Sequence, residues 1–543
     1  MEHWIIELKK GLKGDVQNDE ETLKKYSRDA SVFEIKPKIV VFPKDLEDVK
    51  YLVEFVKKRK GLSLTARAAG TDMTGGPLTT SIVVSFTKYF NHIKKVENTH
   101  AVVEPGVYYR DLEKKMNQIG VMYPSYPASK SICALGGIIA NNAGGEKCLT
   151  FGQTVDHVKK IKAVLADGNC YELKELNEEE LKRKMQKKDF EGYIYREVFA
   201  LCEKNYELIK SAEPKVSKNS CGYFLWKVWD RERKVFDLSK LFVGSQGTLG
   251  LWTEADIHLV KKEKHARLVV AFLKDFSQIS PLIEMVKPFH PESLESFDKY
   301  TLKLAMRFLP QIAKKIHRNL FSFLWEFKKE GVETLLAGLP VFMILIELTG
   351  NDSQELQKKS NELGKLLTNN KIRNIVMKSE REGEKYWAMR RESFSLLREK
   401  VRNKTASPFV EDFSVKPQHL SEFLPKMYRL LKDHNIQPNI AGHVGDGNFH
   451  IIPLMNLKNV KERKKIPVVM EKFTSLVNTY HGTMTAEHND GLIRTMYVKK
   501  QFGKNMVKLF EQVKDIFDKN EIFNPGKKVH ANMKFVLSHI KKT

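Results

Sequence analysis

The chain has 543 residues, a formal net charge of +25 and a pI near 9.5, and 42% of its residues are hydrophobic. This length exceeds the roughly 250–300 residues that one hydrophobic core supports, so we expect two or three domains with an active site in a cleft between them. No apolar run approaches the roughly 18 residues of a membrane-spanning helix, and no secretory signal is visible at the N-terminus.

The cysteines and the charge narrow the class of protein. The five cysteines include no Cys-x-x-Cys pair, which is typical of a reducing compartment. We therefore expect a cytoplasmic protein, with peripheral contact at the inner face of the membrane as the alternative. The same spacing argues against a built-in four-thiolate iron–sulfur cluster. Lysines are spread along the chain without a recognition module, so no specific nucleic-acid binding is expected.

The first half alternates between strand and helix patterns. Residues 1–35 form a polar lead-in, in which 19–25 favour a helix. Prolines bound a predicted strand at 37–43, and apolar spacing predicts a helix at 46–58. Further strands are predicted at 63–65, 81–86 and 101–106. The pattern indicates an α+β domain.

Three glycine-rich loops interrupt this half, at 67–76, 135–145 and 243–250. Glycine permits positive φ and lets backbone N–H groups converge on an anion such as a pyrophosphate. The first loop is too irregular for the Rossmann or Walker patterns. Because each loop lies beside an apolar strand pattern, the three together predict a large phosphate-bearing ligand wrapped by backbone.

The second half resumes the strand and helix rhythm. Strands predicted at 268–273, 341–347, 372–377 and 451–453 indicate a mostly antiparallel domain. Residues 305–340 depart from the rhythm and carry apolar residues at helical spacing beside basic ones. Such a basic amphipathic insertion suits a membrane surface, although packing on its own domain is the expected outcome.

Two histidines in this half flank an Asp-Gly turn signal. A two-residue type I′ hairpin there would set His443 directly opposite His450, with Cβ atoms roughly 5 Å apart on one face. Two imidazoles so placed can hold a cation, and Glu487 is the best third ligand, which leaves His488 for proton transfer. The alternative is an exposed cross-strand histidine pair and an unrelated Glu-His sequence.

From about residue 26 to 528 the chain resembles the vanillyl-alcohol oxidase or p-cresol methylhydroxylase (PCMH) superfamily, in its branch with glycolate oxidase large subunit, D-lactate dehydrogenase and D-2-hydroxyglutarate dehydrogenase. The resemblance rests on the three loops, on Lys218-Asn219-Ser220-Cys221-Gly222-Tyr223 and on Asn524-Pro525-Gly526-Lys527. It implies an α+β fold, with a two-part PCMH-type FAD-binding domain and a mostly antiparallel, ferredoxin-like substrate or cap domain. The expected boundaries are 1–35 (helical lead-in), 36–262 (FAD-binding domain), 263–520 (substrate and metal domain, with the 305–340 insertion) and 521–543 (a segment returning to the FAD-binding domain).

The resemblance also implies which residues contact FAD. Those residues lie in the three glycine-rich loops, in the segment before the second loop, and near the C-terminus. They are Arg67, Gly70, Thr71, Thr74, Gly75, Gly76, Pro127, Ser129, Gly136, Gly137, Asn141, Asn142, Gly144, Gly145, Gly244, Gly247, Thr248, Leu249 and Asn524. Relatives with covalent flavin often have histidine where Thr71 stands, so the FAD is expected to be non-covalent. Gln246 stands where relatives usually have Glu, which changes a local charge but not the backbone. Asn489 and Asp490 stand where relatives usually have Gly and an aliphatic residue, and this second difference bears on substrate preference.

Chemistry is implied in the same way. In metal-using relatives, the residues that match His443, His450 and Glu487 bind a divalent ion, for which zinc or manganese is expected here, and the match of His488 is the base. The Cα hydrogen passes as hydride to flavin N5. Arg390 matches the carboxylate clamp, although an ordinary surface arginine is its alternative. Hydroxyglutarate enzymes hold the second carboxylate with a lysine that 409–413 lacks, so a monocarboxylate such as D-lactate or glycolate, or a larger hydrophobic acid, fits better.

The expected function is therefore FAD-dependent, metal-assisted oxidation of a 2-hydroxy acid to the 2-oxo acid. Electrons would pass to an external acceptor: a quinone, an electron-transfer flavoprotein, a cytochrome or an iron–sulfur subunit. Two alternatives remain open. One is an alkyl-dihydroxyacetone-phosphate-synthase-like flavoenzyme, and the other is a flavin-binding accessory subunit of an electron-transfer complex. The sequence predicts no oligomeric state.

Overall fold

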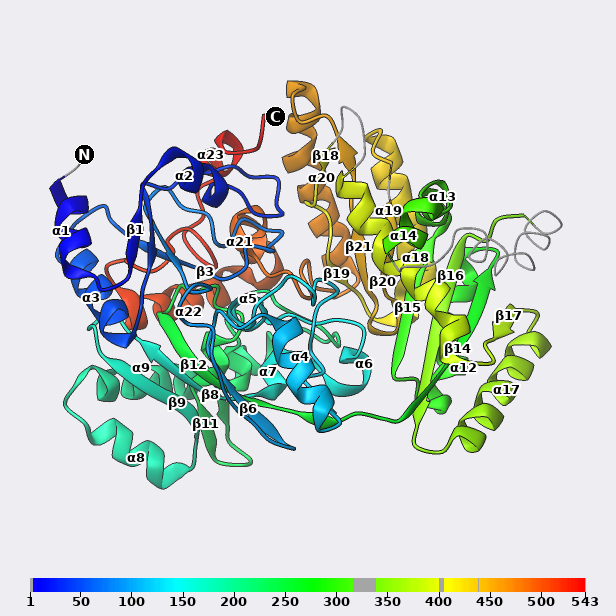
Figure 1. Ribbon diagram of the computed structural model, residues 1–543, viewed down its shortest axis with the longest axis horizontal. Helices are drawn as coiled ribbons and strands as arrows, with labels where there is room; N and C mark the ends of the chain where they lie inside the picture. The colour runs from blue at the N-terminus through cyan, green and yellow to red at the C-terminus, as the bar shows by residue number, and fades with distance from the viewer. Residues whose placement is uncertain (1–2, 316–337, 400–404, 438, 543) are drawn as a thin grey trace.

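The computed structural model describes residues 3–315, 338–399, 405–437 and 439–542, with side chains omitted at 315 and 392–399 (Figure 1). The N-terminal half contains a four-stranded and a seven-stranded sheet, and the C-terminal half contains a second seven-stranded sheet on the opposite side of the molecule in Figure 1; each half also has one two-stranded sheet. Helices and antiparallel sheets mix in both halves, which confirms the expected α+β class. No helix within these ranges combines the length and apolarity needed to span a bilayer.

The smaller N-terminal sheet has strand order β1-β2-β4-β3, with β2, β4 and β3 parallel. Every residue of β2 and β4 is buried, as expected for parallel strands covered on both faces. Asp45 begins α3 by accepting a hydrogen bond from the backbone N–H of Asp48. The elements are α1 (His3–Gly11), β1 (Asp15–Gln17), α2 (Glu20–Tyr26), β2 (Ile39–Phe42), α3 (Leu46–Lys57), β3 (Leu64–Arg67) and β4 (Ile82–Ser85). The predicted strands and helices of this region are confirmed to within a few residues.

The second sheet is antiparallel, with order β10-β11-β9-β8-β12-β6-β5. Val164 of β8 and Leu251 of β12 are fully buried in the hydrophobic core of the smaller sheet, so the two sheets share one core. The strands are β5 (Ile93–Val96), β6 (His100–Val103), β8 (Val158–Val164), β9 (Cys170–Leu176), β10 (Trp229–Asp230), β11 (Val235–Asp237) and β12 (Leu251–His258). The helices beside them include α4 (Tyr109–Gln118), α5 (Leu135–Asn141), α8 (Glu178–Gln186) and α9 (Phe190–Lys204).

The C-terminal sheet is antiparallel throughout, with order β17-β14-β16-β15-β20-β21-β19. Its strands are β14 (His265–Leu273), β15 (Ser293–Asp298), β16 (Phe342–Gly350), β17 (Arg373–Val376), β19 (Phe413–Ser414), β20 (Ile440–His443) and β21 (Asn448–Ile451). The strand predicted at 451–453 therefore begins and ends earlier than expected.

Alternating side chains of the C-terminal sheet belong to two different cores. Ile344 and Ile346 pack on the face covered by α12 (Ile279–Val286), α17 (Ser353–Asn369) and α19 (Leu420–Asp433). Met343 and Leu345 pack on the opposite face, under α13 (Lys299–Arg307), α14 (Leu309–Lys315) and α18 (Glu380–Glu399). We call this second face the site face, because it carries His443 and His450, two of the three candidate metal ligands.

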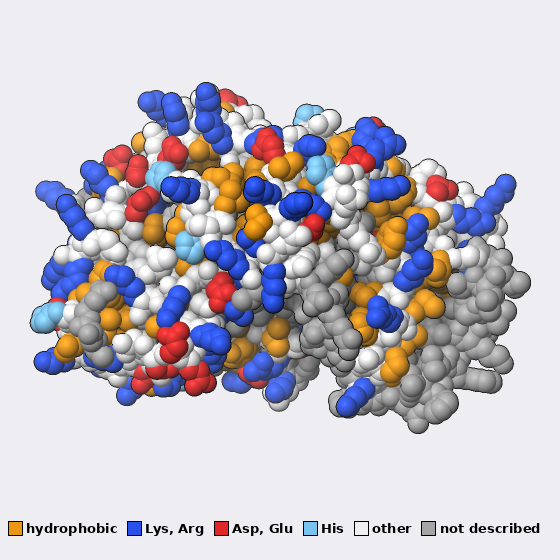
Figure 2. Space-filling view, turned by 90° about the horizontal axis from the view of Figure 1, so that it is seen from above, with side chains coloured by type: hydrophobic (Ala, Val, Ile, Leu, Met, Phe, Trp, Pro, Cys, Tyr) orange, Lys and Arg blue, Asp and Glu red, His pale blue; other side chains and the backbone are white. Residues whose placement is uncertain are grey.

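The described part of the basic amphipathic insertion packs on its own domain. Phe308 is 9% exposed and Ile312 is fully buried, both in the core of the site face. Packing, the expected outcome, is thus confirmed for α14. The remainder of the insertion, 316–337, lies outside the described residues. Figure 2 shows lysine and arginine side chains scattered over the described part of one face of the molecule, which agrees with a diffuse surface charge.

The last long helix leads the chain back to the N-terminal half. α22 (Val498–Asp518) packs against α9, and its buried Lys514 donates hydrogen bonds to the carbonyls of Thr248 and Phe523, at 2.7 and 2.8 Å. Asn524 follows and is buried among the loops of that half. The C-terminal segment therefore closes the structure around the glycine-rich loops.

Candidate active site

A cavity of about 890 Å³ lies between the two halves of the chain. The N-terminal half lines it with segments of all three glycine-rich loops, and the C-terminal half adds Arg390, Arg391 and three histidines. A cavity of this volume, lined by glycine-rich loops and by a polar cluster, suits a cofactor bound beside a substrate.

The first glycine-rich loop follows directly from the carboxyl end of β3, where parallel sheets bind ligands. Gly70 has φ +74°, and a Cβ there would lie 2.4 Å from the guanidinium of Arg67. That guanidinium donates to the carbonyls of Tyr26 and Arg28, at 3.1 and 2.8 Å, so it braces the loop against the preceding segment. The carboxylate of Asp72 accepts from the backbone N–H of Gly76 at 2.8 Å and holds the loop closed on itself.

The second and third loops contact the first through Asn141, whose Nδ2 donates to Asp72 Oδ1 at 2.8 Å, and through Gln246, whose Nε2 donates to Thr74 Oγ1 at 3.4 Å. Gln246 donates to Asn141 Oδ1 at 3.2 Å and accepts from the backbone N–H of Gly491 at 2.8 Å. Gly136 is needed for close approach, since a Cβ there would lie 2.7 Å from the carbonyl oxygen of Pro105. The amide of Gln246 thus uses both its donor and its acceptor to join these loops to the segment that follows His488.

The structure separates the predicted cofactor residues into two groups. Those that line the cavity are Arg67, Gly70, Thr71, Gly76, Pro127, Ser129, Gly136, Gly137, Asn141 and Gly247. Those that do not line the cavity are Thr74, Gly75, Asn142, Gly144, Gly145, Gly244, Thr248, Leu249 and Asn524. Members of the second group connect loops: Asn524 Nδ2 donates to the carbonyls of Gly76 and Gln246, at 3.0 and 2.7 Å.

The hairpin that carries the two histidines differs from the predicted one. His443 pairs with Asn448 and His450 pairs with Ala441, so the histidines are diagonal rather than opposite. The loop forms a 3-10 turn over Val444–Asp446, with Gly447 at φ +63°, instead of a two-residue type I′ turn. The longer loop is favoured because it buries Asp446 against Lys218, at 3.3 Å, where a type I′ tip would expose it. Diagonal neighbours still meet, and the two imidazole rings lie 5.4 Å apart, nearly perpendicular.

Glu487 belongs to a separate segment of the chain and lines the cavity together with the two histidines. Its Oε1 lies 3.1 Å from His443 Nε2, and its Oε2 lies 4.0 Å from His450 Nε2. Donors that share a tetrahedral zinc ion, each about 2.0–2.1 Å from the metal, are roughly 3.3 Å apart, so the two separations bracket the required spacing. A Cβ on Gly144 would lie 3.2 Å from Glu487 Oε1, which explains a glycine at this position. Two imidazoles and a carboxylate are therefore a donor set that fits a divalent ion.

The buried charges around Glu487 set its ionisation. Burial raises the pKa of Glu487, but Lys218, whose Nζ lies 2.6 Å from Oε1, and His443 hold that pKa well below its usual range. Burial lowers the pKa of His443, whereas the Glu295 and Glu487 carboxylates raise it to about 9 in the metal-free protein. The pKa of His450 is well below its usual value because the ring is buried and lies next to His488. Glu487 is thus ionised and His450 neutral, as metal ligands must be.

Asp412 shapes the segment that carries Glu487 and His488. Its Oδ2 accepts the consecutive backbone N–H groups of Ala486, Glu487 and His488, at 3.0, 2.9 and 2.6 Å, and the hydroxyl of Thr485 at 2.8 Å. Asp412 is fully buried and has φ +71°. One carboxylate oxygen therefore fixes the backbone of both predicted functional residues.

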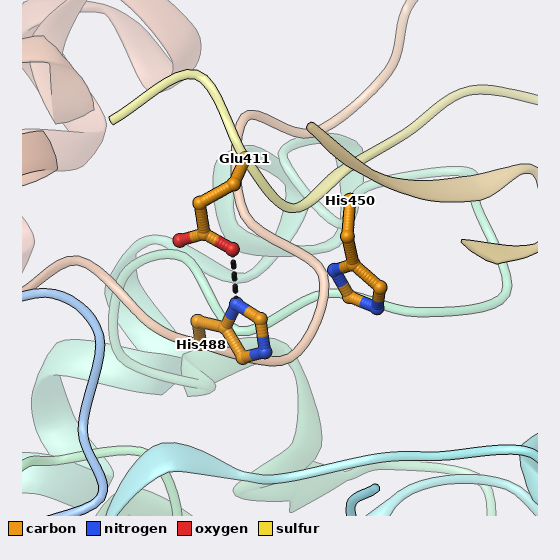
Figure 3. A group of neighbouring side chains, drawn as sticks. All are labelled: Glu411, His450 and His488. Carbon is orange, nitrogen blue, oxygen red and sulfur yellow. Dashed lines mark hydrogen bonds and ion pairs between the residues drawn. The ribbon is translucent and has the colours of Figure 1, made fainter. Parts of the chain in front are cut away.

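His488 lies beside His450 with its other nitrogen bound to a carboxylate (Figure 3). Nδ1 is hydrogen-bonded to Glu411, and the rings of His488 and His450 stack with centroids 4.9 Å apart. Arg494 in turn binds the side chain and the carbonyl of Glu411. Burial lowers the pKa of His488, while Glu411 and Asp412 raise it to about 9. The carboxylate on Nδ1 leaves Nε2 as the nitrogen available for proton transfer.

Arg390 is 4% exposed, so it is not an ordinary surface arginine. Its Nε and one terminal nitrogen lie 3.2 and 3.1 Å from Glu295 Oε2, and it lines the cavity. The neighbouring Arg391 contacts Glu146 of the N-terminal half at 2.6 Å and bridges the two halves. Arg390 and Arg391 therefore have different partners although both reach the cavity.

Sequence reasoning missed Glu295 and Arg494 as parts of the site, named Lys218 only within the 218–223 segment of the family resemblance, and treated Glu411 and Asp412 only as the place of an absent lysine. All five are buried charged residues. A charge at an inward position of an apolar strand, such as Glu295 between Leu294 and Ser296, is the signal that could have found one of them.

Comparisons with known proteins agree with this architecture. Residues 262–528 match the family model of FAD linked oxidases, C-terminal domain, and residues 37–174 match that of the FAD binding domain. D-2-hydroxyglutarate dehydrogenase of Escherichia coli (strain K12) is 26% identical over 528 residues, covering 95% of this chain and 50% of that protein. The chain thus spans about half the length of that relative.

A relative of similar length is glycolate oxidase subunit GlcD of Bacillus subtilis (strain 168), which is 24% identical over 508 residues, covering 92% of this chain and 91% of that protein. The solved structure of p-cresol methylhydroxylase with substrate bound has a TM-score of 0.69 at 13% identity and covers 97% of this chain and 96% of that one. The last similarity shows a shared PCMH-type fold. With both domain models matched in order along the sequence, the chain belongs to the family of FAD-linked oxidases.

Proposed function

We propose that this protein is an FAD-dependent dehydrogenase that oxidises a 2-hydroxy acid to the 2-oxo acid with the help of a divalent metal ion. The observation that carries the proposal is the cluster that lines the cavity, where the His443, His450 and Glu487 donor set adjoins His488 and Arg390. When bound, FAD supplies a hydride acceptor, and a zinc or manganese ion supplies a positive charge that acidifies the substrate hydroxyl.

The protein's own residues would divide the remaining work. Arg390 would bind the substrate carboxylate, for which a guanidinium held from behind by Glu295 is suited. His488 would take the hydroxyl proton at Nε2, because Glu411 occupies Nδ1. The loops from the N-terminal half would hold FAD non-covalently, since Thr71 offers no imidazole for a covalent link.

For the substrate we propose a monocarboxylic 2-hydroxy acid of the D-lactate or glycolate type. The support is the charge at 409–413: Glu411 and Asp412 are acidic, and both are committed to the His488 segment. They cannot attract a second substrate carboxylate. The name of the Escherichia coli relative makes D-2-hydroxyglutarate the natural competitor in any test.

Electrons would leave to an external carrier of one of the classes named above, because the described cysteines are dispersed and form no cluster. An alkyl-dihydroxyacetone-phosphate-synthase-like activity is the second candidate among flavoenzymes of this fold. An accessory flavin-binding subunit is the third. Retention of the whole His443, His450, Glu487 and His488 set favours dehydrogenation over both.

The test is anaerobic bleaching of the flavin absorbance by D-lactate, L-lactate, glycolate and D-2-hydroxyglutarate, with and without a chelator. The proposal expects chelator-sensitive bleaching by D-lactate or glycolate and loss of bleaching in His488→Ala. His481→Asn is a matched control, because His481 is exposed and asparagine tolerates its φ of +51°. Release of FAD on denaturation would support non-covalent binding. Bound FAD that none of the acids bleaches would contradict the dehydrogenase assignment.

A further inference from the structure

Glu295 lies directly behind the residues that line the cavity. It sits within β15 on the site face and is 1% exposed. Ser296 pairs with Gly442 in the antiparallel register, which brings the preceding Glu295 beside His443 on the neighbouring strand. α18 covers the same face and brings Arg390 to the other side of this carboxylate.

The two oxygens of Glu295 have different partners. Oε1 is hydrogen-bonded to His443 Nδ1, and Oε2 accepts from Arg390 Nε at 3.2 Å with a terminal guanidinium nitrogen at 3.1 Å. One buried carboxylate therefore touches a candidate metal ligand and the candidate substrate clamp at once. Neither contact is screened, because all three side chains are almost fully buried.

This arrangement determines which nitrogen of His443 faces the other metal donors. A carboxylate accepts hydrogen bonds only, so Nδ1 must carry a proton, and Nε2, which lies 3.1 Å from Glu487 Oε1, is the nitrogen that would give up its proton to bind a metal ion. A carboxylate behind a ligand histidine also fixes the ring and raises its basicity, and replacing such a partner typically costs roughly 10–100-fold in metal affinity.

We propose that Glu295 is a positioning residue that fixes the tautomer of His443 for metal binding while it orients Arg390 for the substrate carboxylate. This rests on the proposed function, because it assigns the metal to His443 and the acid to Arg390. It adds that the metal site and the substrate clamp share one carboxylate, so a substitution of Glu295 affects metal binding and acid binding unequally.

The inequality follows from the chemistry of Glu295→Gln. A glutamine has one acceptor oxygen and one donor nitrogen, so it cannot satisfy two donors. Arg390 has no acceptor and must keep the oxygen, whereas His443 can accept from the amide by moving its proton from Nδ1 to Nε2. The proton then occupies the atom that should bind the metal. The variant should lose metal affinity while keeping its binding of the acid.

The experiment uses FAD-loaded protein freed of metal. Zn²⁺ affinity is measured by competition with a chromophoric chelator, and the Co²⁺ absorption spectrum reports the ligand set. Binding of pyruvate, a 2-oxo acid, to the metal-free protein is followed by the change in flavin absorbance. Glu295→Asp keeps the acceptor character. Glu347→Gln is the matched control, because Glu347 is a partly buried glutamate of the adjacent strand whose partner is Lys147.

We expect Glu295→Gln to bind Zn²⁺ roughly 10–100-fold more weakly, with an altered Co²⁺ spectrum and unchanged pyruvate affinity. Glu295→Asp should restore part of the loss, and Glu347→Gln should match the wild type. Equal Zn²⁺ affinity in Glu295→Gln and wild type, or an equal loss in Glu347→Gln, would overturn the role of Glu295. A wild-type protein that binds neither ion would instead overturn the metal site of the proposed function, and this role with it.

Discussion

Asp412→Asn tests how strongly one carboxylate holds the catalytic segment. Asp412 Oδ2 accepts four hydrogen bonds from residues 485–488, and its Oδ1 accepts one from Asn448 Nδ2 at 3.2 Å. Asparagine has nearly the same shape and tolerates the φ of +71°, so the substitution changes charge and hydrogen bonding without adding backbone strain.

The magnitude follows from the contacts. Hydrogen bonds to an ionised group contribute about 1 kcal/mol more than neutral ones, so four of them lose about 4 kcal/mol. Burial raises the pKa of Asp412, because the charged carboxylate is costly to bury. Removing that charge therefore offsets about half of this loss of stability. The new amide also faces the amide of Asn448, which cannot turn because it donates to the carbonyl of Phe413 at 2.9 Å. A donor facing a donor adds about 1–2 kcal/mol, for a net destabilisation of about 3–4 kcal/mol.

Thermal unfolding followed by circular dichroism and Zn²⁺ titration measure the two consequences. For a domain of this size we expect the unfolding midpoint of the C-terminal half to fall by roughly 6–16 °C. Metal affinity should fall as well, because Glu487 loses its fixed backbone. Asp433→Asn, at an exposed aspartate on α19, is the control and should change neither. An Asp412→Asn protein with the wild-type midpoint and wild-type Zn²⁺ affinity would refute the reasoning.

Three further outcomes are expected. Burial raises the pKa of Glu146, but Arg391 and nearby lysines hold it at about 2. Because a depressed carboxyl pKa stabilises the fold above the unfolded value of 4.5, Glu146→Gln should cost about 3 kcal/mol at pH 7. In urea titrations, that difference from wild type should shrink as pH falls from about 4.5 towards 2. Lys514→Met removes a buried partner of Asp518 and three hydrogen bonds, so urea denaturation should show a loss of about 3–5 kcal/mol. A smaller loss in Lys514→Met/Asp518→Asn, which removes the charge and keeps an acceptor for the backbone N–H groups of Ile522 and Phe523, would confirm that the unpaired charge is the cause. Gly136→Val should lower the FAD content of the purified protein, measured by absorbance, because its side chain would meet the carbonyl of Pro105. Gly350→Ala, where a Cβ would meet only Leu356 Cδ1 at 4.0 Å, should keep its FAD.

Local pattern predicted much of the N-terminal half. Prolines and continuous apolar runs located β2 and β4, and the capping Asp45 with its apolar spacing located α3, because these signals act within a few residues. The same local reasoning failed at the histidine hairpin. An Asp-Gly pair favours a type I′ turn only when nothing else binds the aspartate, and here Lys218, more than 200 residues earlier in the chain, holds Asp446 inside.

Sequence alone determined the family, the glycine-rich loops and the four residues His443, His450, Glu487 and His488. Each of these depends on residue type and short spacing. Only the tertiary structure decided which charges surround them. Lys218, Glu295, Glu411 and Asp412 come from separate segments, and their roles exist only because folding buries them where an unpaired charge is costly and a paired one is held firmly.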